Sequence, residues 1–156
     1  MAPDGRAPEE GGAALKLRAE DAEDLAVISA CLQDALVLVR DLAFVPEDRA
    51  FLLAANRFRW EGGLQLAAED AEYQRTLCGV TFNEVTAVTY SGFRRSEVGR
   101  ILSLLAIRSA NGGILLEFSG GATVRLEAAR VLCHATDIGE PWPTQWQPRH
   151  DLDEPA

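Results

Sequence analysis

The sequence has few residues of the types that build metal centres or nucleophilic sites. It contains three cysteines and two histidines in 156 residues, and no C-x-x-C pair or Cys/His spacing typical of a zinc site. Cys31, Cys78 and Cys133 lie far apart in the chain, each among apolar neighbours, which is typical of reduced thiols in the core of a cytosolic protein. We therefore expect no disulfide, no metal and no cofactor.

Long apolar runs are also missing. The longest, LAVISACL and ILSLLAI, fall well short of the ~18 residues that a membrane-spanning helix needs. The first residues, MAPDGRAPEEGGAA, lack the basic and apolar regions of a secretory signal. These absences predict a soluble cytoplasmic protein that does not associate with membranes.

No familiar catalytic motif occurs: there is no G-x-S-x-G, H-E-x-x-H, Walker or G-x-G-x-x-G string. Cys133 and His134 are adjacent in a predicted strand, so they point to opposite faces and do not form a dyad. Asp41, Glu84 and Asp137 lie at strand ends, where turns usually solvate carboxylates. A non-enzymatic protein is therefore favoured. An enzyme with a pocket inside the bent sheet, using Asp41, Glu84, His134 or the arginines, is the alternative.

The overall composition indicates one globular domain. Hydrophobic residues make up 47% of the chain and charged residues 25%, which matches ordinary globular usage. The net charge of -9 repels phosphate backbones, so DNA binding is disfavoured. We expect a disordered tail over residues 1–14, a globular α+β domain over 15–140, and an extended tail over 141–156. Because burying tryptophan is favourable, Trp142 and Trp146 predict that this last tail docks on a sheet edge.

One helix is predicted near the N-terminus. Asp21 offers a side-chain oxygen to cap it, and two carboxylates follow in the first turn. Its apolar positions recur at helical spacing and form one stripe that should pack on a sheet: Leu25, Ile28, Leu32 and Ala35.

Most of the remaining chain reads as strands. Segment 42–45 should pair with 50–55 so that Phe44 faces Phe51, and segment 114–118 should pair with 122–126 across a three-residue loop. Leu36–Val39 is predicted as a strand buried on both faces. The fold class is therefore α+β, with a mostly antiparallel bent sheet or partial barrel of about seven to nine strands and the helix packed against it. A barrel like that of pleckstrin-homology domains is a lesser alternative, because those domains place their long helix last.

The stretch AFLLAANRFRWE, residues 50–61, changes face in mid-strand. Its first apolar residues are odd-numbered, whereas Phe58 and Trp60 are even-numbered. A β-bulge near Asn56–Arg57 would restore one buried face and turn Arg57 or Arg59 outward.

Arginines form the best candidate for a binding surface. Arg94, Arg95 and Arg100 lie in the loop-like stretch SGFRRSEVGR, in which we identify no aromatic pair. The leading hypothesis is a non-enzymatic module that binds a protein partner, a second copy of itself or a small ligand, at this loop or at an open sheet edge. Arg57, Arg59 and Trp60 extend the candidate site, and with Phe58 they offer a local patch for RNA binding as an alternative.

Five strings, taken in chain order, make the chain resemble a known family. They are LKLRAEDAEDLAVISACLQDA, DLAFVPEDRAFLLAANRFRWE, LSLLAIR, GILLEFSGGATVRLE and a closing DIGEPW. They are similar to domain-of-unknown-function family 2948, found in alphaproteobacteria, over roughly residues 15–149. The resemblance implies one intact domain in a bacterial cytoplasm. It implies no activity, ligand or catalytic residue.

Overall fold

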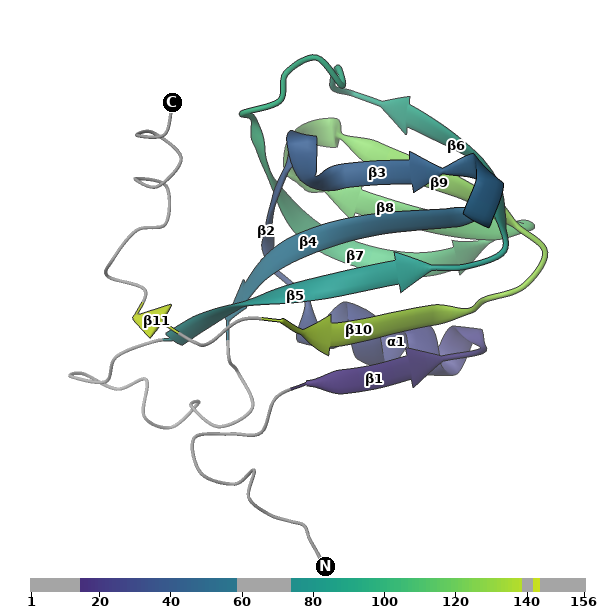
Figure 1. Cartoon of the computed structure of the whole chain (residues 1–156), viewed down its shortest axis with the longest axis horizontal. Coiled ribbons are helices and arrows are strands. Elements are labelled where there is room, and N and C mark those ends of the chain that lie inside the picture. The colour runs from purple at the N-terminus through teal and green to yellow at the C-terminus, as the bar shows by residue number, and fades with distance from the viewer. Residues whose placement is uncertain (1–14, 59–73, 139–141, 144–156) are drawn as a thin grey trace, which may run out of the picture.

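The computed structural model describes residues 15–58, 74–138 and 142–143, which form one α-helix and an eleven-stranded sheet (Figure 1). The helix is α1 (Ala22–Cys31), and β1 (Lys16–Ala19) precedes it. Between the helix and residue 58 lie β2 (Leu36–Leu38), β3 (Leu42–Val45) and β4 (Ala50–Phe58). The later strands are β5 (Gln74–Phe82), β6 (Val85–Ser91), β7 (Ile101–Ala110), β8 (Gly113–Phe118), β9 (Thr123–Ala128), β10 (Cys133–Asp137) and β11 (Trp142–Pro143).

Helix α1 begins where the sequence predicts. The side chain of Asp21 accepts a hydrogen bond from the Asp24 N–H at 2.8 Å, which satisfies one of the amides left free at a helix start. All four residues of the predicted apolar stripe are buried. The helix packs against β7, where the Ser29 Oγ accepts from the Ile107 N–H at 2.9 Å. The helix is thus held to the sheet by apolar packing and by a side-chain hydrogen bond.

The sheet is antiparallel and strongly bent, in the order β1-β10-β5-β4-β2-β7-β8-β9-β6. Strand β4 is long enough to pair with β3 through its first half and with β2 at Asn56, while its other edge pairs with β5. Strands β3, β4 and β5 therefore lie in front of β7, β8 and β9 (Figure 1). Buried side chains from both sets fill one core, including Leu53, Val80, Leu116 and Val124. The fold is an α+β domain with an open bent sheet.

Both predicted hairpins have the predicted registers. Phe44 lies opposite Phe51 between β3 and β4. Leu116 lies opposite Val124 between β8 and β9, and the Phe118 N–H donates to the Ala122 carbonyl across the three-residue loop. That loop needs positive φ at Gly120 and Gly121, which glycine adopts without strain. The side-chain pattern was therefore sufficient to select these pairings.

The predicted β-bulge is wrong. Strand β4 pairs with β5 in unbroken register from Phe51↔Phe82 to Phe58↔Arg75. Phe51, Leu53, Ala55 and Arg57 consequently share the buried face, and Arg57 is fully buried instead of pointing outward. The strand keeps the same face buried because the Asp137 carboxylate pairs with the Arg57 guanidinium there.

Three smaller expectations also differ from the structure. Segment 36–39 is a strand only over β2, with Val37 buried but Leu36 and Leu38 half-buried, because β2 presents one face to the outside of the sheet. Strand β10 covers Cys133–Asp137, whereas we expected a strand over residues 131–135 that residues 136–139 bring to an end. The sheet has eleven strands, which is more than the seven to nine that we predicted. Helix α1 is the second element, unlike the last-placed helix of the pleckstrin-homology alternative.

Candidate binding site between β3 and β6

Strands β3 and β6 each have one edge that is unpaired within the described part of the chain. β3 pairs only with β4, and β6 pairs only with β9. The start of β6 is joined to the connection between β3 and β4, where the Val85 N–H donates to the Arg49 carbonyl at 2.9 Å, and β3 and β6 run apart from there (Figure 1). We call these two unpaired edges, of Leu42–Val45 and Val85–Ser91, the β3–β6 seam. It is the place where the bent sheet does not close.

Arg95 bridges the seam at its other end. The guanidinium carbon lies 4.7 Å from the centre of the Tyr90 ring, a cation–π contact. Its Nη2 lies 3.5 Å from the Leu42 carbonyl oxygen, which is long for a hydrogen bond. Arg95 therefore connects the loop after β6 to the first residue of β3 by contacts that a better partner can replace.

Tyr90 has an unusual environment. Its ring is half-buried and meets Phe93 edge-on at 5.9 Å. The hydroxyl oxygen is buried and has no hydrogen-bond partner within the described residues, a state that costs about 1–3 kcal/mol for a buried polar group. Burial raises the pKa of Tyr90, and the positive charge of Arg95 partly opposes that rise. Phe44 and Val88, also half-buried, line the same seam and pack on the core.

The loop that carries Arg95 is ordered by its own hydrogen bonds. Glu97 Oε1 accepts from the Arg94 N–H at 2.9 Å and from Arg100 Nη1 at 3.1 Å. These two contacts lower the pKa of Glu97, the backbone one more strongly. The Val39 N–H donates to the Arg100 carbonyl and joins the loop to the chain before β3. Three arginines against one glutamate leave the loop with a net charge of +2.

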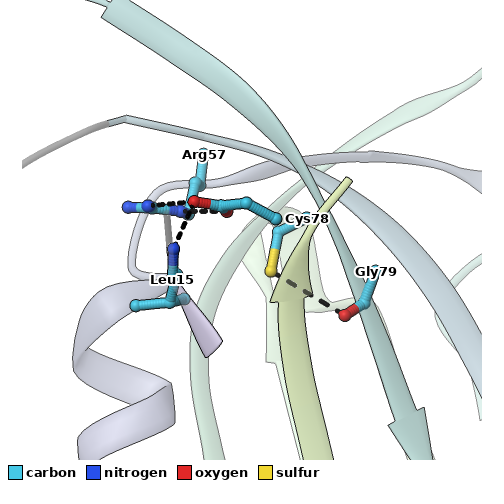
Figure 2. Close-up of polar contacts among 5 residues, drawn as sticks. Leu15, Arg57, Cys78 and Gly79 are labelled. Carbon is cyan, nitrogen blue, oxygen red and sulfur yellow. Dashed lines mark hydrogen bonds and ion pairs between the residues drawn. The ribbon is translucent and has the colours of Figure 1, made fainter. Parts of the chain in front are cut away.

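Arg57 lies elsewhere, inside the sheet. Its Nε and Nη2 donate to the two oxygens of Asp137 at 2.9 and 2.8 Å, and Asp137 Oδ2 also accepts from the Leu15 N–H at 2.7 Å (Figure 2). The prediction that Arg57 extends an exposed patch required an exposed side chain, whereas Arg57 is fully buried. Arg59 and Trp60 lie outside the described residues. The predicted RNA patch thus loses one of its four surface residues.

The candidate catalytic residues Asp41, Glu84 and His134 lie on different elements of the fold. Asp41 ends the 3-10 helix Val39–Asp41 before β3. Glu84 lies between β5 and β6 and pairs with Arg130 at 3.2 Å. His134 is half-buried on the face of β10 opposite to buried Cys133, as predicted. Over residues 15–58, 74–138 and 142–143, no three His, Cys, Asp or Glu side chains gather as metal ligands would.

The sequence interpretation missed the aromatic pair beside the arginines. Tyr90 and Phe93 lie on either side of Gly92, where the chain bends with a φ of 84°, and the two rings are in contact. Aromatic residues on either side of a glycine, directly before Arg94 and Arg95, are visible in the string YSGFRR. That arrangement could have indicated the aromatic pair. The contact of Arg95 with Leu42, 53 residues earlier, has no such signal in the sequence.

The fold defines the class of this protein as an α+β domain with an open antiparallel sheet. Basic and aromatic side chains gather at the unpaired edges of that sheet. The chain matches the family described as "Protein of unknown function (DUF2948)" over residues 15–150, and it belongs to that family. Searches of curated proteins and of solved structures return no match. Within the described ranges, no helix has both the length and the apolar character required to cross a bilayer.

Proposed function

We propose that this protein is a non-enzymatic interaction module of the cytoplasm that binds a protein partner at the β3–β6 seam and the adjoining 91–100 loop. One observation carries the proposal. Arg95 contacts both Tyr90 at the end of β6 and the Leu42 carbonyl at the start of β3. An open sheet edge and an arginine loop, two surfaces suggested separately by the sequence, therefore belong to one site.

Exposed strand edges support a protein as the ligand. An unpaired edge offers a row of backbone N–H and C=O groups, to which another chain can add a strand. Aromatic side chains and arginine, which concentrate at the centres of protein interfaces, lie beside these edges here. Tyr90 is already in contact with both Phe93 and Arg95, so these side chains lose less freedom on binding than separate side chains would.

Charge indicates an acidic partner. The loop carries +2 in a chain with a net charge of -9, so it is a local basic site on an acidic protein. Acidic segments are attracted to it, whereas a second copy of this acidic chain is repelled on average. Partner recognition at this loop is therefore favoured over self-association.

Affinity capture with full-length protein tests the proposal. Arg94, Arg95 and Arg100 are all changed to glutamate in one variant. The matched control changes three exposed, ion-paired arginines on other strands and loops, Arg18, Arg108 and Arg130, and has the same net charge. Partners identified with the wild type are then titrated against all three proteins. Binding should be lost only in the loop variant, and equal loss in both variants would count against this site.

A further inference from the structure

The β3–β6 seam has the features of a site for one added strand. We infer that the partner contributes an extended segment of alternating apolar and acidic residues, which lies along β3 and β6, receives a hydrogen bond from Tyr90 and draws Arg95 away from Leu42. This inference rests on the proposed function and specifies the ligand class and binding mode of the same site.

Backbone geometry supports the pairing with β3. The Leu42 carbonyl accepts from Arg95, so this edge of β3 faces away from β4 and toward β6. Peptide groups point alternately to the two edges of a strand, which places the N–H and C=O of Phe44 on the same edge as the Leu42 carbonyl. The Leu42 N–H already donates to the Val39 carbonyl. An incoming strand can therefore replace the 3.5 Å contact of Arg95 with a peptide N–H at the usual ~2.9 Å.

Side-chain environment defines the sequence of the added segment. Alternate residues of a strand point to opposite faces. Side chains facing inward at the seam would meet half-buried Phe44 and Val88, which favours apolar residues. Side chains facing outward would lie near exposed Arg94 and Arg95, which favours carboxylates. The ligand is thus a strand that is amphipathic and acidic.

The unpartnered hydroxyl of Tyr90 provides a polar anchor. In the free protein this buried oxygen has no hydrogen-bond partner in the described structure. A backbone carbonyl of the added strand can accept from it. Removing the hydroxyl should therefore stabilise the free protein and weaken the complex. A purely structural tyrosine would change stability and binding in the same direction, so the opposite signs are diagnostic.

Fluorescence polarisation with the full-length protein can measure this. The probe is labelled Val-Glu-Val-Glu-Val-Glu amide, and the matched probe replaces each glutamate with lysine. We expect the acidic probe to bind and the basic probe to bind at least about tenfold more weakly. Tyr90→Phe should raise the midpoint of urea unfolding yet weaken acidic-probe binding by about three- to tenfold. Arg95→Ala should weaken binding, and Arg108→Ala, which removes an exposed arginine on β7, should not.

Amide hydrogen exchange provides the structural readout. Bound acidic probe should protect the Phe44 amide and leave the Ile114 amide, inside the β8–β9 hairpin, unchanged. Absence of acidic-probe binding, or unchanged affinity in Tyr90→Phe, would overturn the inference. The proposed function itself depends on the loop variant and the natural partner. Strand addition can thus be rejected while partner binding at the loop stands.

Discussion

Arg57 and Asp137 form a two-point ion pair across the inner face of the sheet. Two nitrogen–oxygen distances of 2.9 and 2.8 Å join them, and their side chains are 0% and 5% exposed. Arg57 lies on β4 and Asp137 on β10, so the pair crosses β5, the strand between them, where Cys78 lies opposite Asp137. Asp137 also accepts from the Leu15 N–H and so ties the start of β1 to the same point.

Removing one member of this pair should destabilise the protein strongly. Asp137→Ala leaves a buried guanidinium without its carboxylate, and the expected loss is about 3–5 kcal/mol in the free energy of unfolding. Urea denaturation followed by circular dichroism measures it. Arg108→Ala, which breaks the exposed Arg108–Glu117 pair, should cost less than about 1 kcal/mol. Similar losses in the two variants would show that burial does not amplify the Arg57–Asp137 interaction.

Replacing both members by apolar residues should recover much of that loss. Arg57→Met with Asp137→Val removes both charges with little change in side-chain volume, a change that is often neutral or stabilising at buried pairs. The double variant should therefore be more stable than Asp137→Ala in the same urea experiment. A double variant as unstable as the single one would indicate that the hydrogen bond to Leu15 dominates.

Two of the three thiols should be unreactive in the folded protein. Burial raises the pKa of Cys78 to about 12, and the negative charge of Asp137 adds to the rise. Burial likewise raises the pKa of Cys133 to about 12. Because the thiolate is the reactive form, neither should react with Ellman's reagent at pH 8 until the protein unfolds. Cys31, which is half-exposed, serves as the internal comparison and should react first.

The same thiols should make stability fall at alkaline pH. Their folded pKa of about 12 lies above the ordinary value of 9.0, so the unfolded state loses these protons first as pH rises. Stability from this source is complete below pH 9 and declines between about pH 9 and 12, by about 1.4 kcal/mol per pH unit per thiol. The Cys78→Ala, Cys133→Ala double variant should show a shallower slope. Parallel slopes for both proteins would contradict the raised pKa values.

Gly113 should not tolerate a side chain. A Cβ at this position would lie 2.2 Å from the Leu126 carbonyl oxygen on the neighbouring strand, so Gly113→Ala must push β8 and β9 apart. We expect a loss of at least about 2 kcal/mol, in the range of overpacking substitutions. Gly99→Ala is the control, because nothing lies within 4 Å of its Cβ position and its φ is ordinary. Thermal unfolding of the two variants separates steric clash from glycine entropy.

The helix cap should contribute a modest, separable amount. Asp21→Ala removes the acceptor for the Asp24 N–H and should cost about 1 kcal/mol. Asp21→Asn keeps an acceptor and should retain most of the stability, so urea midpoints of the pair isolate the hydrogen bond from the charge. Equal losses for both would assign the effect to the interaction of the carboxylate with the helix dipole.

Local patterns in the sequence predicted much of the fold. The apolar stripe of α1 and the Asp21 cap involve residues within a few positions of each other, and the two hairpin registers follow from alternation on either side of a short loop. The candidate site was predicted only in part. Arg94, Arg95 and Arg100 were visible as a basic loop, but neither the seam beside it nor the Tyr90–Phe93 pair was recognised.

Periodicity by itself determined which side chains face the core, because alternation and helical spacing depend only on near neighbours in the chain. Tertiary structure alone decided what happens to the charged residues. Arg57 follows the buried face of its strand because a carboxylate 80 residues later meets it there, and Arg95 reaches the carbonyl of Leu42 only because the sheet bends far enough to bring β6 beside β3. A guanidinium is stable in either setting, so its own neighbours in sequence cannot indicate which one it occupies.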